Sequence, residues 1–95
     1  MRAVLADDSG IFREGLRLLL EAAGVAVVAA VGTVPALTEA IARTRPDVAV
    51  VDVRMPPTFT DEGLRAVVTL RRDHADLGLL VLSTSVDAVS AAQLL

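Results

Sequence analysis

The 95-residue chain contains no cysteine, lysine, tryptophan or tyrosine. Without cysteine, neither disulfide bonds nor thiolate metal sites can contribute to the fold, which fits a reducing compartment. The longest uninterrupted apolar stretch, residues 25–31, is too short to cross a bilayer, and the N-terminus lacks the long apolar segment of a secretory signal. We therefore expect a cytoplasmic protein that makes no contact with a membrane.

All nine basic residues are arginine, and twelve acidic residues give a net charge of −3. Nucleic-acid affinity rests mainly on clustered basic side chains, so we expect no direct DNA binding by this segment. The length leaves room for one domain with one modest core. Any mechanism that needs a lysine must find it outside these residues.

Short apolar runs alternate with longer segments of helical periodicity, which is typical of consecutive β-α units that form a parallel sheet. The apolar runs predict strands at residues 2–6, 25–31, 48–51 and 79–82. The helical spacing predicts helices at about 12–23, 34–45 and 61–74, with a further helix beginning near residue 85. The sequence therefore predicts an α/β fold.

Single residues predict where these helices begin and end. Gly24 is placed to end the first helix in a left-handed conformation, and Thr33 is placed to cap the second. In the third helix, Leu64, Val67 and Val68 are predicted to face the core.

Acidic and hydroxyl side chains follow three of the predicted strands: Asp7 and Asp8 the first, Asp52 the third and Ser83 the fourth. Open parallel sheets bind ligands at the carboxyl ends of their strands. Two carboxylates ~4 Å apart repel by roughly 4 kcal/mol at an effective dielectric near 20, so a cluster of three needs a cation or a proton. Mg²⁺ prefers oxygen ligands and is commonly held by one or two carboxylates plus a phosphate. The pattern predicts a magnesium site with one carboxylate left to react.

Each of these residues also has a plainer explanation. Asp7 and Asp8 could cap the first helix, where acidic residues are favoured. Asp52 taken alone would be an ordinary loop acid. Ser83 could cap the following helix, although Ser85 is better placed for that task.

Five segments carry a resemblance to a known family: residues 4–8 (VLADD), 12–16 (FREGL), 45–47 (RPD), 51–56 (VDVRMP) and 81–83 (VLS). Together they resemble the receiver domain of two-component response regulators, and within it the LuxR-type (NarL-like) branch of transcriptional regulators. The resemblance spans essentially all 95 residues. It implies a flavodoxin-like parallel sheet with strand order 2-1-3-4, and residues 1–95 as one incomplete receiver domain without its fifth strand, its fifth helix or an output domain.

The resemblance implies a role for each matching residue. Asp52 would accept a phosphoryl group from a sensor histidine kinase. Asp7, Asp8 and Asp52 would bind Mg²⁺ together with the backbone carbonyl of Arg54, and Ser83 would be the switch hydroxyl that turns toward the phosphoryl group. The chain would then be a signalling phosphoacceptor rather than an enzyme, and would normally control a C-terminal DNA-binding domain.

The chain departs from the family pattern in three places. The family's site includes a lysine at the end of a fifth strand, and this chain has neither, so we expect its own Mg²⁺-dependent phosphotransfer to be weakened. The surface that the family often uses to dimerise is missing together with the fifth helix. The loop at residues 55–63 is longer than the usual turn.

Two other functions stay open. A truncated receiver that no longer switches could act as an interaction or dimerisation fragment, pairing with a kinase, a second copy or a full-length regulator. A phosphotransferase of the haloacid-dehalogenase type also uses a strand-end aspartate as its nucleophile. That class needs a second aspartate two positions later, where this chain has Arg54.

Overall fold

The computed structural model describes residues 1–58 and 60–82, in which strands and helices alternate. The strands are β1 (Arg2–Ala6), β2 (Ala26–Val31), β3 (Val48–Asp52) and β4 (Gly78–Leu82). The helices are α1 (Gly10–Ala22), α2 (Val34–Thr44) and α3 (Glu62–Asp73). The helix predicted to begin near residue 85 lies outside the described residues. None of the described helices has the length and apolar character needed to span a membrane.

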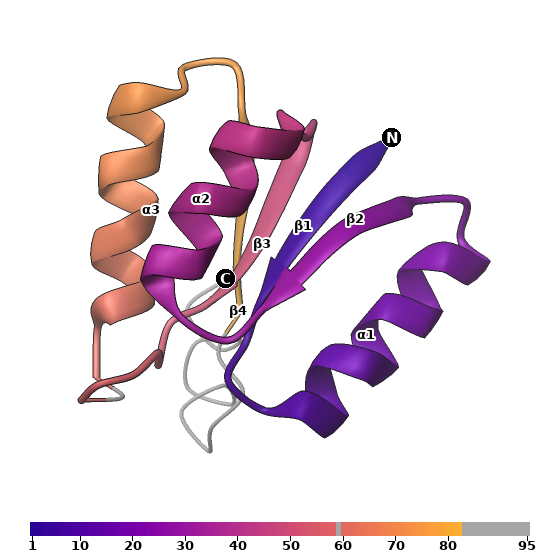
Figure 1. Ribbon diagram of the computed structural model, residues 1–95, viewed down its shortest axis with the longest axis horizontal. Helices are drawn as coiled ribbons and strands as arrows, with labels where there is room; N and C mark the ends of the chain where they lie inside the picture. The colour runs from indigo at the N-terminus through magenta and orange to yellow at the C-terminus, as the bar shows by residue number, and fades with distance from the viewer. Residues whose placement is uncertain (59, 83–95) are drawn as a thin grey trace, which may run out of the picture.

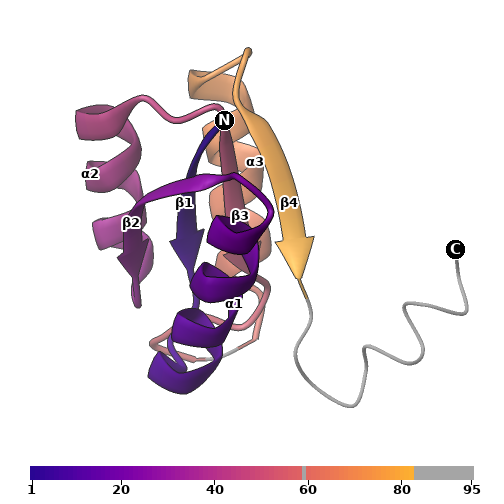
Figure 2. The same cartoon turned by 90° about the vertical axis from the view of Figure 1, so that its right-hand side faces the viewer.

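The four strands form one parallel sheet in the order β2-β1-β3-β4, which confirms the order that the family resemblance implied. Helices α2 and α3 cover one face of the sheet and α1 lies on the other (Figures 1 and 2). Because β1 and β3 are parallel neighbours, their carboxyl ends lie side by side at one edge. The residues that directly follow these two strands therefore lie next to each other.

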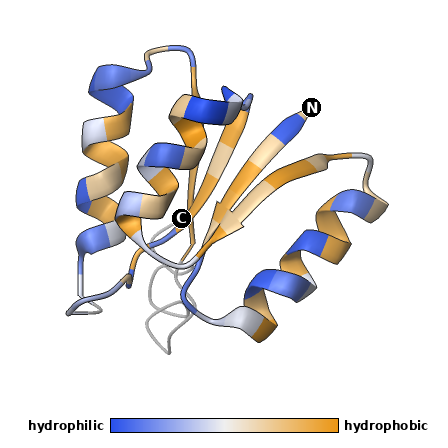
Figure 3. Ribbon diagram, viewed as in Figure 1, coloured by the Kyte–Doolittle hydropathy of each residue, from blue (hydrophilic) through white to orange (hydrophobic). Residues whose placement is uncertain are grey.

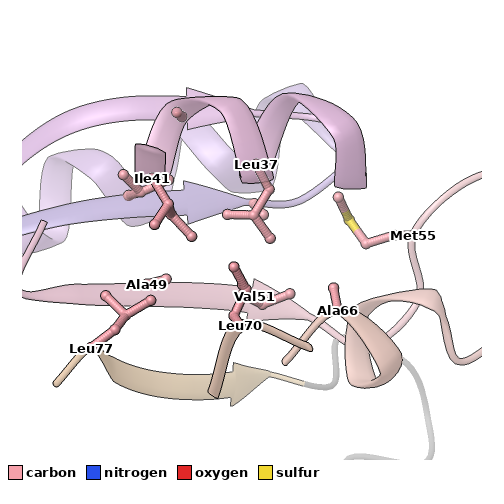
Figure 4. Close-up of a cluster of buried hydrophobic side chains, with 11 residues drawn as sticks. Leu37, Ile41, Ala49, Val51, Met55, Ala66, Leu70 and Leu77 are labelled. Atoms are coloured by element: carbon pink, nitrogen blue, oxygen red, sulfur yellow. The ribbon is translucent and has the colours of Figure 1, made fainter. Parts of the chain in front are cut away.

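The hydrophobic core lies between the sheet and the pair α2 and α3 (Figure 4). Val4 and Ala6 of β1 and Ala49 and Val51 of β3 point into it, because alternate strand residues face the same side of a sheet. The remaining core residues are Leu37, Ala40, Ile41, Met55, Ala66, Leu70 and Leu77. Hydropathy colouring shows nearly continuous apolar strands and helices of mixed character, as expected for a sheet covered by amphipathic helices (Figure 3).

Local signals set the helix ends. Gly24 follows α1 with φ of 89°, which confirms the predicted left-handed residue. The hydroxyl of Thr33 accepts a hydrogen bond from the Ala36 N–H at 3.2 Å, which confirms the predicted cap of α2.

The buried face of α3 differs from the sequence prediction. Leu64 is 49% exposed and Val68 is 67% exposed, so the prediction that both face the core is wrong. Val67, the third residue of that prediction, is partly buried and packs against the core. The buried residues of α3 are Glu62, Gly63, Ala66 and Leu70.

A close backbone approach at Gly63 explains this orientation. The Gly63 N–H donates to the carbonyl oxygen of Val53 at 2.9 Å. A Cβ atom at position 63 would lie 1.7 Å from the carbonyl oxygen of Asp52. Glycine lets the first turn of α3 lie against the end of β3, and this contact turns Ala66 and Leu70 toward the core.

Replacing Gly63 with alanine should lower the free energy of unfolding by about 2 kcal/mol or more, because the added methyl group displaces backbone at the end of β3. Gly15→Ala in α1 is the matched control, since a Cβ there meets nothing within 4 Å. It should be neutral or stabilise by roughly 0.5–1 kcal/mol through helix propensity. Urea denaturation measures both. Equal stability of the two variants would contradict the close approach.

Candidate functional site

Three carboxylates meet at the carboxyl end of the sheet. Asp7 and Asp8 directly follow β1, and Asp52 is the last residue of β3. One carboxylate oxygen from each lies within 4.8 Å of the other two. The structure therefore brings together the three acidic residues that the sequence predicted to converge.

The three residues differ in their access to solvent. Asp7 is 3% exposed and Asp52 is 2% exposed, whereas Asp8 lies at the surface. Buried carboxylates need hydrogen-bond donors or a cation beside them, because an isolated buried charge is costly. Two of the three carboxylates are therefore buried, and a small ion can approach the cluster from solvent on the side of Asp8.

Only one of the two carboxylate oxygens of Asp7 has a hydrogen-bond partner among the described residues. Its Oδ1 atom accepts a hydrogen bond from the Ser9 N–H at 2.8 Å, but its buried Oδ2 atom has no hydrogen-bond partner among the described residues. Burial raises the pKa of Asp7, and the charge of Asp8 adds to this rise; the Ser9 N–H and the Arg13 guanidinium oppose it. A buried carboxylate oxygen of this kind suits a divalent cation.

A backbone N–H also donates to Asp52. Its Oδ1 atom accepts a hydrogen bond from the Arg54 N–H at 3.2 Å. This contact places the backbone of Arg54 beside the acidic cluster. The three carboxylates, one with a buried oxygen that has no partner among the described residues, fit Mg²⁺.

Arg13 is a site residue that the sequence reading missed. Its guanidinium Nη1 donates to the backbone carbonyl oxygen of Asp7 at 2.7 Å, which brings a positive charge to the cluster. Gly32 leaves room for it, since a Cβ there would lie 3.2 Å from the same nitrogen. Arginine early in a helix looks like a solvated residue in sequence, so only the tertiary contact reveals it.

Glu62 is a second residue whose burial and hydrogen bonds the sequence did not predict. It is 8% exposed, and its carboxylate accepts hydrogen bonds from the N–H groups of Thr58 and Thr60 at 2.7 and 3.1 Å and from the Thr58 hydroxyl. The Thr58 hydroxyl, followed by the backbone donors, lowers the pKa of Glu62 to about 2. The extended loop after β3 is thus folded around one buried carboxylate.

The plainer reading that Asp7 or Asp8 caps α1 is wrong. Ser9 is the cap residue, and its hydroxyl accepts a hydrogen bond from the Phe12 N–H at 3.3 Å. Ser83, the predicted switch hydroxyl, lies outside the described residues.

The chain belongs to the response regulator receiver domain family, whose model matches residues 3–95. Response regulator MprA of Mycobacterium leprae is 43% identical over 90 residues, covering 95% of this chain and 37% of that protein. MprA of Mycobacterium avium is 42% identical over the same length and coverage. The chain therefore spans about 37% of the length of the curated relatives it matches.

Solved structures agree with this family. A LuxR-family two-component response regulator from Aurantimonas sp. aligns with a TM-score of 0.80 and 29% identity, covering 97% of this chain and 64% of that one. The isolated REC domain of RcsB from Salmonella enterica serovar Typhimurium, in the presence of the phosphomimetic BeF3−, aligns with a TM-score of 0.79 and 26% identity, covering 98% and 70%. The chain is a receiver domain of a two-component response regulator, and this favours that function over the haloacid-dehalogenase alternative.

Asp7→Asn should stabilise the metal-free protein at pH 7 by on the order of 1 kcal/mol, because the amide removes a buried charge beside an acidic neighbour. Thermal unfolding without divalent cations measures the effect. Asp76→Asn makes the same change in net charge at an exposed position and should change stability by no more than about 0.5 kcal/mol. Destabilisation by Asp7→Asn would show that the folded protein depends on that charge.

The stability difference between the wild type and Glu62→Gln should depend on pH. The folded pKa of Glu62, about 2, lies below the usual 4.5, so its stabilising contribution is complete above pH 4.5 and is lost as the pH falls through about 2. The difference in melting temperature should therefore be constant above pH 4.5 and shrink below it. Glu39→Gln, at a side chain that is 67% exposed, should follow the wild type throughout. A difference that persists undiminished at pH 2 would contradict the assignment.

Proposed function

We propose that this chain is the phosphoryl-accepting receiver of a LuxR-type (NarL-like) response regulator, in which Asp52 takes a phosphoryl group from a sensor histidine kinase. Asp7 and Asp8 would hold Mg²⁺, with Asp52 and the backbone carbonyl of Arg54 as the remaining protein ligands. The observation that carries this proposal is the approach of the three carboxylates to within 4.8 Å of one another.

The chemistry follows from the arrangement of the acidic side chains. When bound, Mg²⁺ supplies positive charge to the phosphoryl oxygens. Asp7 offers a buried oxygen and Asp8 an exposed one, while the Arg54 N–H orients the carboxylate of Asp52. A carboxylate oxygen of Asp52 attacks phosphorus; the new P–O bond forms as the P–N bond to the kinase histidine breaks, and the electron pair leaves with the histidine nitrogen.

Ser83 keeps its proposed role as the switch hydroxyl. In the sheet Asp52 pairs with Leu82, so Ser83 directly follows the residue opposite the phosphoacceptor. A hydroxyl at this position could turn to donate a hydrogen bond to a phosphoryl oxygen. The 95 residues contain no lysine, so a lysine that contacts the phosphoryl group would have to come from outside them.

The proposed branch and the proposed role in a transcription regulator are inferred from proteins similar to this chain. The LuxR-family regulator and the RcsB structures support the proposed branch, whereas the curated relatives carry the name MprA. One RcsB structure contains dimers bound to DNA. We take residues 1–95 as one receiver unit of a longer transcription regulator, in which pairing of receivers and DNA binding by another domain would follow phosphorylation.

Incubation with Mg²⁺ and acetyl phosphate should add the mass of one phosphoryl group to the intact protein, and EDTA should prevent this addition. Asp52→Asn should abolish it, because the amide cannot form the acyl phosphate. Asp76→Asn, which alters an exposed carboxylate elsewhere, should be phosphorylated like the wild type. A modification that survives Asp52→Asn would remove Asp52 from the mechanism.

A further inference from the structure

The described part of the loop between β3 and α3, residues 53–58 and 60–61, begins directly after Asp52. At its start, the Gly63 N–H donates to the carbonyl oxygen of Val53 at 2.9 Å. Position 63 also lies against the carbonyl group of Asp52, where only glycine fits. The first turn of α3 therefore holds the beginning of this loop.

Glu62, the residue before Gly63, holds the other end of the loop at Thr58 and Thr60. One oxygen of Glu62 accepts from the Thr58 N–H at 2.7 Å and from the Thr58 hydroxyl, and the other oxygen accepts from the Thr60 N–H at 3.1 Å. Both oxygens are therefore occupied within the loop, which leaves Glu62 unsuited to bind a metal itself. Its role is confined to holding backbone in place.

The carboxylate is specifically suited to this task, because every one of these contacts uses it as an acceptor. A glutamine has the same size but replaces one acceptor oxygen with an NH₂ donor. Either the donors of Thr58 or those of Thr60 would then face another donor inside a nearly closed site. Glu62→Gln therefore disturbs the loop while it preserves the volume of the side chain.

Arg54 and Met55 lie between the two points at which α3 holds the loop, Val53 and Thr58. Met55 is fully buried and lies near Leu37 and Ala66 in the core (Figure 4). Arg54, one residue earlier, directs its N–H to Asp52. The backbone of Arg54 is thus fixed on one side by the acidic cluster and on the other by a loop whose end is tied to α3.

We propose that Glu62 is a positioning residue for the acidic site, because by holding Thr58 and Thr60 it keeps the backbone of Arg54 where it bonds Asp52 and can offer its carbonyl oxygen to a cation. The inference rests on the proposed function for the presence of Mg²⁺. The hydrogen bonds that it concerns are present without metal.

The first test needs no metal. In Glu62→Gln the Arg54 amide should exchange with solvent about tenfold faster relative to the Val50 amide in the central strand, because the loop opens without the sheet. Ile41→Val is the matched control: it removes one methylene from the core in α2, away from Met55 (Figure 4). It should change both amides together.

The second test is a Mg²⁺ titration followed through the backbone NMR signals of Asp7 and Asp8. Glu62→Gln should weaken Mg²⁺ binding about tenfold, as the loss of a supporting contact behind a metal ligand does. Ile41→Val should bind Mg²⁺ like the wild type. Thr58→Val takes the place of Glu62→Gln if that variant does not fold. It removes only the hydroxyl donor to Glu62, so it should weaken Mg²⁺ binding less than tenfold.

Unchanged Arg54 exchange or unchanged Mg²⁺ affinity in the Glu62 and Thr58 variants would overturn this inference while the proposed function stands. If the wild type itself fails to bind Mg²⁺, the proposed function falls and the inference falls with it. The wild-type titration therefore separates the two failures.

Discussion

Repulsion among the carboxylates of Asp7, Asp8 and Asp52 is the constraint on which the other features of the site depend. Their oxygens lie within 4.8 Å of one another, so like charges oppose folding, and the burial of Asp7 and Asp52 adds to this cost. The parallel pairing of β1 with β3 nevertheless brings the three together, and the Ser9 and Arg54 N–H groups each offset part of the negative charge. A divalent cation is the natural complement of what remains.

The same edge of the sheet determines how α3 packs. Glycine at position 63 allows the helix to begin in contact with the end of β3, and Glu62 ties the preceding loop to that first turn. The core contacts of Ala66 and Leu70 follow from this start one and two turns later. The packing of the helix and the geometry of the site are thus set by one local contact.

Much of this could be predicted from the sequence, because strands covered on both faces are continuous apolar runs and the three aspartates directly follow two of them. The face of α3 that packs on the core could not be predicted. The apolar spacing of Leu64 and Val68 does not show that the backbone at position 63 lies against the end of β3. Arg13 and Glu62 were missed for a related reason. Charged residues near a helix start resemble solvated ones until tertiary contacts show what they bind.

Helix α1 is amphipathic, yet none of its residues is buried, and Ile11 and Leu19 are 90% and 71% exposed. A helix held by so little buried surface can detach from the sheet at a lower free energy than global unfolding requires. The backbone N–H of its cap residue, Ser9, donates a hydrogen bond to Asp7, so detachment of α1 would withdraw that donor from a buried carboxylate. A cation bound at Asp7 would therefore favour the docked position of α1, in which Ser9 both caps the helix and donates to this carboxylate.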